Sequence, residues 1–192
     1  MLFRSSSNAA RGVYRRLEER PSPHNLVSDT KSLRAVGADR SQGGTPPILF
    51  ERNDGGNQTQ VSGISVKGAD LDYGSTLVQY RWDQNRLGWL RSQNGSPHSD
   101  VDGLQIAPEV VVIQIVSYTR SAADGRSPEA VLVGTGRALL LFDGRLIEGT
   151  WERSGAFDVT RYFDRDGNAV LFPRGTTWIA LPRVGQTRII EN

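Results

Sequence analysis

The 192-residue sequence contains no cysteine. A disulfide, a thiolate metal site and a cysteine nucleophile are therefore excluded, and the absence fits a protein on either side of a membrane. Long apolar runs are also missing. The longest spans residues 110–116, is interrupted by Gln114, and falls far short of the ~20 residues that a membrane-spanning helix needs. The first residues, MLFRSSS, lack the apolar core of a signal peptide.

An excess of charge of either sign is absent too. The formal net charge is +2, and the basic residues, nearly all arginines, are scattered along the sequence rather than clustered. Nucleic-acid-binding domains usually show a basic patch or stripe, so we expect no nucleic-acid partner. Hydrophobic residues at 37% and charged residues at 23% are typical of a folded globular protein.

The clearest structural signal is a pair of Asp-Gly dipeptides, at residues 143–144 and 166–167, each between two apolar runs. Asp-Gly tolerates the positive φ angles of a two-residue hairpin turn, so each dipeptide predicts a β-hairpin. The expected cross-strand pairs are Phe142–Arg145, Leu141–Leu146 and Leu140–Ile147 at the first turn, and Phe163–Val170 and Tyr162–Leu171 at the second.

Strand patterns also dominate the rest of the chain after residue 47. Residues 76–82 alternate apolar and polar side chains, and residues 87–91 return after a turn. Residues 109–118 are the most apolar and β-branched, which predicts a central strand buried on both faces. Residues 61–66 predict an outer strand and residues 177–181 a last one. The predicted fold is mostly β: an antiparallel meander or barrel-like sheet with a short helical N-terminal segment.

The N-terminal segment predicts helices instead. Residues 8–20 place apolar side chains at helical spacing after a possible N-cap, Asn8, and Pro21 ends the pattern. A second, short helix is expected from about Asp29 to Val36. Residues 37–47 are rich in glycine, proline and polar residues, which is typical of a linker.

The two histidines both follow proline, in Pro23-His24-Asn25 and Pro97-His98-Ser99-Asp100. Histidine is suited to proton transfer near neutral pH, and Asp100 is placed to orient the ring of His98. One hypothesis is therefore a catalytic polar site made by His98 and Asp100, joined by His24 and Asn25. The alternative is that proline fixes each loop while these side chains bond to local backbone groups.

Other chemistries have weaker support. Residues 100–103 and 164–168 resemble calcium loops but lack the glycine and glutamate positions that an EF-hand requires. There is no Gly-x-Ser-x-Gly motif, and no helix pattern follows the glycines of residues 134–137 to form a phosphate loop. We expect no metal ion and no cofactor. Trp151 and Trp178 are either core residues or exposed platforms for carbohydrate.

Several segments together resemble one family, the YerB-like bacterial lipoproteins. The segments are GTGR (134–137), DGR (143–145), EGTW (148–151), GTTWI (175–179), YRRLEERPSPHNLV (14–27), YRWDQNRLGWLRSQNGSPHSDVDG (80–103) and VVVIQIV (110–116). The resemblance implies that residues 46–192 are the family's C-terminal β domain. Residues 1–45 would then be the helical tail of a missing N-terminal domain, followed by a linker. The sequence would accordingly be a piece of a longer protein, or a shortened or mis-started gene product.

The resemblance also implies where the protein works. It predicts an extracytoplasmic protein of the cell envelope, held at the membrane only through a lipid anchor on the full-length parent. Its partner would be an unknown envelope component or protein. The function favoured by the absence of a complete catalytic set is that of a non-enzymatic binding or scaffolding module. The alternative is a cell-wall-directed hydrolase or transferase that uses His98 and Asp100, so whether the protein is an enzyme stays open.

Overall fold

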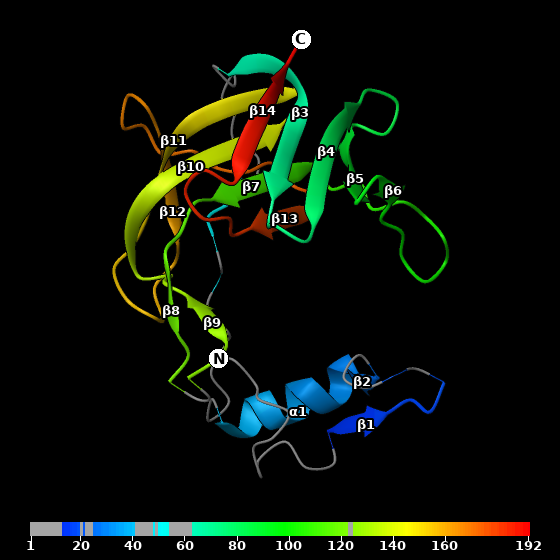
Figure 1. The fold of residues 1–192 in the computed structure, drawn as a ribbon. Helices are drawn as coiled ribbons and strands as arrows, with labels where there is room; N and C mark the ends of the chain where they lie inside the picture. Colours follow the sequence, from blue (N-terminus) through cyan, green and yellow to red (C-terminus); the bar gives the residue numbers. More distant parts are fainter. Residues whose placement is uncertain are drawn as a thin grey trace. The chain divides into compact units, whose positions relative to one another are not determined.

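The structure is a computed structural model that describes residues 13–19, 21, 25–40, 48, 50–53, 63–122 and 125–192 (Figure 1). Contacts between residues divide the chain into two units, residues 1–47 and residues 48–192. No helix in the described part is long and apolar enough to span a membrane. The boundary predicted between residues 45 and 46 lies near this division, and the assignment of residues 1–45 to the tail of a larger domain stays a prediction.

The first unit contains a hairpin and one helix. Strands β1 (Tyr14–Arg16) and β2 (Leu26–Ser28) pair antiparallel, and helix α1 spans Thr30–Arg40. The helix begins where the carboxylate of Asp29 accepts a hydrogen bond from the backbone N–H of Ser32 at 2.8 Å, which is an N-cap. A helix near residues 29–36 is thus confirmed, and it extends into the expected linker.

The helix expected over residues 8–20 is wrong where the structure describes it, because residues 14–16 form β1 instead. An isolated helix of that length is marginal in water, whereas β2 offers the backbone of β1 ready partners. Residues 8–12 lie outside the described residues.

In the second unit, ten strands of the described chain form one sheet, in the order β13-β7-β10-β11-β3-β4-β5-β6, with β12 paired to β11 and β14 to β3. Figure 1 shows this sheet curling into a half-barrel. The strands are β3 (Ile64–Asp72), β4 (Leu77–Asp83), β5 (Gly88–Gln93), β6 (Ser96–Pro97), β7 (Val110–Gln114), β10 (Gly134–Phe142), β11 (Arg145–Arg153), β12 (Arg161–Asp164), β13 (Thr177–Ala180) and β14 (Thr187–Glu191). Strands β8 (Tyr118–Arg120) and β9 (Pro128–Ala130) form a separate pair. A mostly β fold with a short helix near the N-terminus is confirmed.

The first Asp-Gly turn has the predicted register. Asp143 and Gly144 have φ angles of 51° and 68°, and the three predicted cross-strand pairs are all present. The second register is wrong by one residue, because Phe163 pairs with Ala169. There only Gly167 has a positive φ, of 83°, and the carboxylate of Asp164 holds a longer turn.

Two further strand predictions are corrected. Strand β13 pairs with β7 in parallel, so the sheet is not antiparallel throughout. Strand β3, expected as an outer strand over residues 61–66, runs from Ile64 to Asp72 and lies inside the sheet between β4 and both β11 and β14. In both cases the partner is distant in sequence, so the local pattern carries no information on it.

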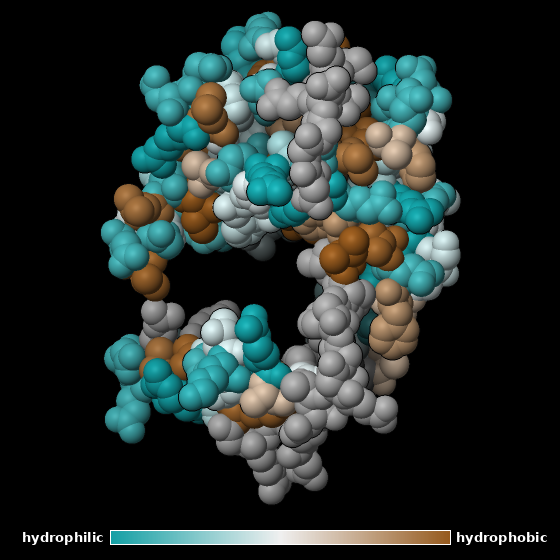
Figure 2. All heavy atoms as spheres, turned by 180° about the vertical axis from the view of Figure 1, so that it is seen from behind, coloured by the Kyte–Doolittle hydropathy of each residue, from teal (hydrophilic) through white to brown (hydrophobic). Residues whose placement is uncertain are grey.

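The core lies on both faces of β7 and β10. Every residue of β7 is buried, as predicted, and successive residues contribute to two different hydrophobic clusters. One cluster contains Tyr80 and Trp89 of β4 and β5, and the other contains Trp151, which is buried as a core residue. On the face shown in Figure 2, apolar side chains of the second unit that reach the surface stand in small groups among hydrophilic ones.

Candidate functional site

Arg91 is a buried charge at the edge of the first cluster. It lies on β5, directly opposite Tyr80 on β4 and two residues after Trp89. Because side chains alternate along a strand, Trp89 and Arg91 point to the same face, toward the core. The residue is only 7% exposed. Strand alternation has therefore placed a guanidinium where an apolar side chain would ordinarily pack.

Side chains from three places in the chain surround this guanidinium. Its carbon lies 4.6 Å from the centre of the Trp178 ring on β13, in a cation–π geometry. Its Nη1 contacts Nδ1 of His98, which follows β6, and donates a long hydrogen bond of 3.4 Å to the side-chain oxygen of Gln93. The rings of His98 and Trp178 meet edge to face, with 5.9 Å between their centres. Trp178, far along the sequence, thus joins the neighbouring residues Arg91 and His98 in one cluster, which we call the Arg91 cluster.

The backbone fixes the position of His98. Its N–H donates to the carbonyl of Arg91 at 3.0 Å, and its own carbonyl accepts from Ile106 at 2.8 Å. The side-chain amide of Gln105 donates to the same Arg91 carbonyl at 2.9 Å. The backbone at His98 is therefore hydrogen-bonded both to β5 and to the returning segment at Ile106, which fixes where the imidazole begins.

The charge state of His98 follows from this environment. Burial lowers the pKa of His98, and the positive charge of Arg91 lowers it further. The imidazole is therefore neutral at pH 7. Because Arg91 has only donors, Nδ1 of His98 accepts the hydrogen bond and the ring proton resides on Nε2.

Asp100 serves its own loop. One carboxylate oxygen accepts hydrogen bonds from the backbone N–H groups of Asp102 at 2.9 Å and Leu104 at 3.0 Å. No hydrogen bond joins His98 to Asp100 in the part of the chain that the structure describes. The aspartate thus shapes the turn that returns the chain to β5, and the group that contacts the imidazole is Arg91.

The remaining predicted site residues lie in the first unit. The side-chain oxygen of Asn25 accepts a hydrogen bond from Arg16 at 2.5 Å, and its backbone carbonyl accepts one from Leu17 at 2.8 Å. Both contacts stabilise the hairpin of β1 and β2. His24 lies outside the described residues.

Arg91 itself was not singled out from the sequence, although Trp178 and His98 were. Two signals were available: its position two residues after Trp89 in a strand with alternating side chains, and the Asn94-Gly95 turn, which places His98 opposite it. Trp178 is half-buried and packs against the first cluster, so it is neither a fully buried core residue nor a free platform.

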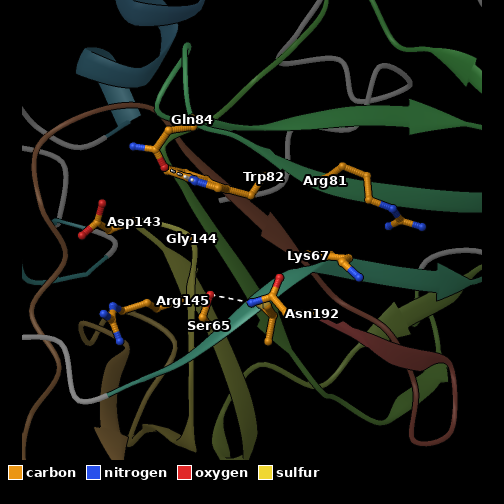
Figure 3. A pocket seen from close by; sticks show the side chains of 10 residues that line it. Ser65, Lys67, Arg81, Trp82, Gln84, Asp143, Gly144, Arg145 and Asn192 are labelled. Carbon is orange, nitrogen blue, oxygen red and sulfur yellow. Dashed lines mark hydrogen bonds between the residues drawn. The ribbon is translucent and has the colours of Figure 1, made fainter.

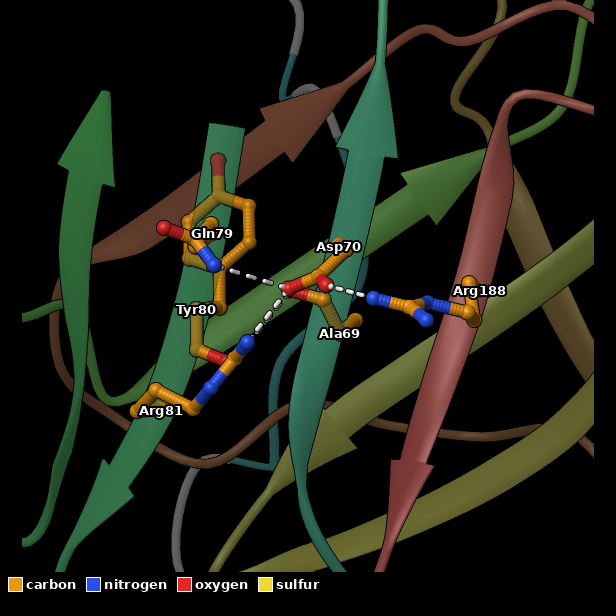
Figure 4. Close-up of polar contacts among 6 residues, drawn as sticks. All are labelled: Ala69, Asp70, Gln79, Tyr80, Arg81 and Arg188. Atoms are coloured by element: carbon orange, nitrogen blue, oxygen red, sulfur yellow. Dashed lines mark hydrogen bonds and ion pairs between the residues drawn. The ribbon is translucent and has the colours of Figure 1, made fainter. Parts of the chain in front are cut away.

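A second polar network lies on β3. The buried carboxylate of Asp70 forms ion pairs with Arg81 of β4 at 2.6 Å and with Arg188 of β14 at 2.7 Å (Figure 4). Burial alone would raise the pKa of Asp70, but the hydrogen bonds from Arg188 and Arg81 outweigh it and hold that pKa below its usual value. The network joins three neighbouring strands and is structural in character.

Away from the Arg91 cluster, described residues of the second unit line two open pockets. One of about 470 Å³ lies where the turn at residues 143–145 meets the start of β3 and the end of β4 (Figure 3). There the side chain of Trp82 donates a hydrogen bond to Gln84 at 3.0 Å, and the side chain of Asn192 donates one to Ser65 at 2.6 Å. Each of these polar groups therefore already has a hydrogen-bond partner within its pair. The other, of about 570 Å³, surrounds Glu148, which already pairs with two arginines. Among the described residues, no group of three or more histidines, aspartates and glutamates is placed to hold a metal ion.

Comparison with known proteins gives one family and one solved structure. Residues 69–179 match the family described as the C-terminal domain of a protein of unknown function, DUF3048. The crystal structure of the YerB protein from Bacillus subtilis is similar, with a TM-score of 0.70 and 24% sequence identity, over 93% of this chain and 60% of that one. The chain thus spans about three fifths of that protein's length, and the likeness shows a shared fold. No curated protein matches the sequence.

Proposed function

This chain belongs to the YerB-like proteins that carry the DUF3048 C-terminal domain, and on that premise we propose that it is a non-enzymatic binding module of the cell envelope. Its ligand is received at the Arg91 cluster, where β5, β13 and the loop after β6 meet. In this proposal, His98 and Asp100 do not act together as a catalytic pair.

The observation that carries the proposal is the contact between Arg91 and His98. A general base needs a free nitrogen lone pair and a pKa near the working pH. Nδ1 of His98 is occupied by a permanently charged guanidinium, and the same charge disfavours the imidazolium that proton transfer would create. Since Asp100 is engaged by its own loop, no carboxylate stabilises that imidazolium either. The cluster is therefore better suited to holding a ligand than to transferring protons.

The cluster also has the composition of a recognition surface. Tryptophan and arginine contribute large contact areas and directional donors, and both are over-represented among residues that dominate binding energy. Here they are stacked on each other and anchored by the backbone of β5 and β13, so little ordering is needed when a ligand binds.

The envelope location rests on the resemblance to lipoproteins, and it makes an envelope component or protein the expected partner. A membrane attachment would come only through the lipid anchor of a full-length parent. Residues 1–45 would connect this module to a preceding domain of that parent.

Isolated bacterial cell walls provide the direct test. The purified chain is mixed with the walls, and both its co-sedimentation and the release of soluble wall fragments are measured. We expect co-sedimentation without release, weakened at least about tenfold by Trp178→Leu, because that change removes the ring under Arg91. The matched control is Phe157→Leu, which also replaces an aromatic ring by leucine, at a side chain that is 83% exposed.

Two outcomes would contradict the proposal. Fragment release that His98→Gln abolishes would make the protein an enzyme. Co-sedimentation that Trp178→Leu and Phe157→Leu leave equally unchanged would place the binding surface elsewhere. Circular dichroism of each variant shows whether the fold is retained.

A further inference from the structure

Three buried donor groups on the inner face of β4 and β5 make no hydrogen bond of ordinary geometry with a described residue, although the hydroxyl of Tyr80 interacts with Arg91. They are Nε of Arg91, the hydroxyl of Tyr80 and the indole Nε1 of Trp89. Tyr80 and Arg91 are cross-strand partners, and Trp89 shares their face. Buried polar groups are satisfied in the great majority of cases, so each exception requires an explanation. Three exceptions at adjacent positions call for a shared one.

The buried charge of Arg91 also requires an explanation. Buried arginines are almost always paired with an anion, because an uncompensated charge in the interior is costly. None of the ion pairs in the described part of the chain includes Arg91. Trp178 attracts the guanidinium through its ring face, Gln93 is uncharged and His98 is held neutral, so none of these neighbours neutralises it.

The atoms that make the existing contacts show which edge of the guanidinium remains available to a ligand. The contacts with Gln93 and His98 both leave from Nη1 of Arg91. The guanidinium also interacts with the hydroxyl of Tyr80, which offsets part of the rise that burial causes in the pKa of that tyrosine. No hydrogen bond of ordinary geometry leaves the edge formed by Nε and Nη2 toward a described residue. That edge carries two parallel N–H donors, which is the geometry that pairs side-on with the two oxygens of a carboxylate or phosphate.

We infer that the Arg91 cluster binds an anionic oxygen group of its ligand through the Nε–Nη2 edge of Arg91, which the hydroxyl of Tyr80 accompanies. The inference deepens the proposed function and rests on it. A carboxylate is favoured over a phosphate because its planar pair of oxygens matches the planar guanidinium. The ring of Trp178 then covers one face of the guanidinium and excludes water from the ion pair.

Thermal unfolding in the presence of simple anions tests this directly. The melting temperature of the chain is measured with sodium acetate, N-acetylglycine or inorganic phosphate, each against sodium chloride of the same ionic strength and pH. A ligand that binds only the folded state raises the melting temperature with concentration. We expect a rise with acetate and N-acetylglycine, and a smaller one with phosphate.

Three variants locate the effect. Arg91→Met removes the buried charge, and it should abolish the anion response while leaving the melting temperature in chloride equal or higher, because an unpaired interior charge is lost. Arg91→Lys keeps the charge but lacks the two-donor edge, and it should weaken the binding of N-acetylglycine at least about tenfold. The control Lys67→Met removes an exposed positive charge from the same sheet and should respond as the wild type does.

The outcomes separate this inference from the function on which it rests. A response to phosphate alone would keep the anion site and assign it to phosphoryl groups. Equal responses of the wild type and Arg91→Met, or none beyond chloride, would overturn the inference. So would a fall of about ten degrees or more in the melting temperature of Arg91→Met in chloride, which would make the guanidinium structural. Cell-wall binding sensitive to Trp178→Leu would stand in each of these cases.

Discussion

Asp70→Asn should destabilise the second unit in a way that depends on pH. The Asp70 side chain is 5% exposed, and its two oxygens accept hydrogen bonds from Arg81 at 2.6 Å and Arg188 at 2.7 Å. Asparagine keeps the shape of the side chain but removes the negative charge that both guanidinium groups approach. The perturbation therefore isolates the ion pairs that hold β4 and β14 to β3.

The magnitude follows from how far each partner is exposed. A hydrogen bond to a charged group contributes about 1.5–3 kcal/mol to stability. The Arg81 side chain is 37% exposed, so part of that value is lost to solvent screening, and the Arg188 side chain is 76% exposed, so its pair adds about 0–1 kcal/mol. We expect Asp70→Asn to cost roughly 2 kcal/mol at pH 7, most of it through Arg81.

The pH dependence has a defined sign. The pKa of Asp70 is lower in the folded chain than its usual value of 3.8, since the hydrogen bonds from Arg188 and Arg81 outweigh burial. A carboxylate of lowered pKa contributes stability above its unfolded pKa, about 3.9, and that contribution is lost as the pH falls through the folded pKa. The deficit of the variant should thus be constant above about pH 5 and shrink as the pH falls below about 4.

Urea denaturation followed by tryptophan fluorescence at pH 7, 5 and 3 measures this deficit. The control Asp102→Asn makes the same charge change in an exposed loop and should cost less than about 0.5 kcal/mol. The reasoning is refuted if Asp70→Asn is as stable as the wild type at pH 7. A deficit that stays unchanged at pH 3 would refute the electrostatic part. Arg81→Gln should cost more than Arg188→Gln.

Three other measurements address the site and the sheet. The pKa of His98, followed by NMR, should lie below 6.5 and rise in Arg91→Met; an unchanged pKa would show that the guanidinium does not act on the ring. Tyr162→Phe should cost about 1–3 kcal/mol in urea denaturation, because the buried side-chain oxygen of Gln114 loses its donor at 2.9 Å, and a neutral change would contradict this. Gly144→Ala should cost about 1 kcal/mol or more, because Gly144 has a φ of 68°, and equal stability would show that the turn relaxes.

Local chemistry explains the parts of the fold that were predicted correctly. Asp143 and Gly144 both tolerate positive φ, so the turn, its register and both flanking strands follow from two residues and the alternation around them. The apolar, β-branched run of β7 has no polar face, so burial on both sides was the one arrangement open to it. The register predicted for the turn near Gly167 was wrong because the carboxylate of Asp164 accepts hydrogen bonds from backbone N–H groups further along the chain. These bonds lengthen the turn by one residue.

The candidate site could be predicted only in part. His98 was identified because histidine is rare in this sequence and follows proline, but the partner expected for it, Asp100, bonds to its own loop. Its contact with Arg91 follows from the β5–β6 hairpin, which places residue 98 opposite residue 91, and the contact with Trp178 depends on β13 joining β7 in parallel. The first pairing has a local signal, the Asn94-Gly95 turn, whereas the second leaves none in a local window of sequence.

The sequence by itself determined the mostly β class, the first hairpin, the burial of β7 on both faces and the family resemblance, because each depends on neighbouring residues and on side-chain period. The central place predicted for β7 is wrong, because only β13 lies beyond it at that end of the sheet. Only the tertiary structure decided that Trp178, from a distant segment, meets the buried Arg91 and its hairpin neighbour His98. The physical reason is that strand partners are selected by the fit of whole faces in the folded chain. The surroundings of the charge at position 91 are therefore complete only when β5, β13 and the loop after β6 have come together.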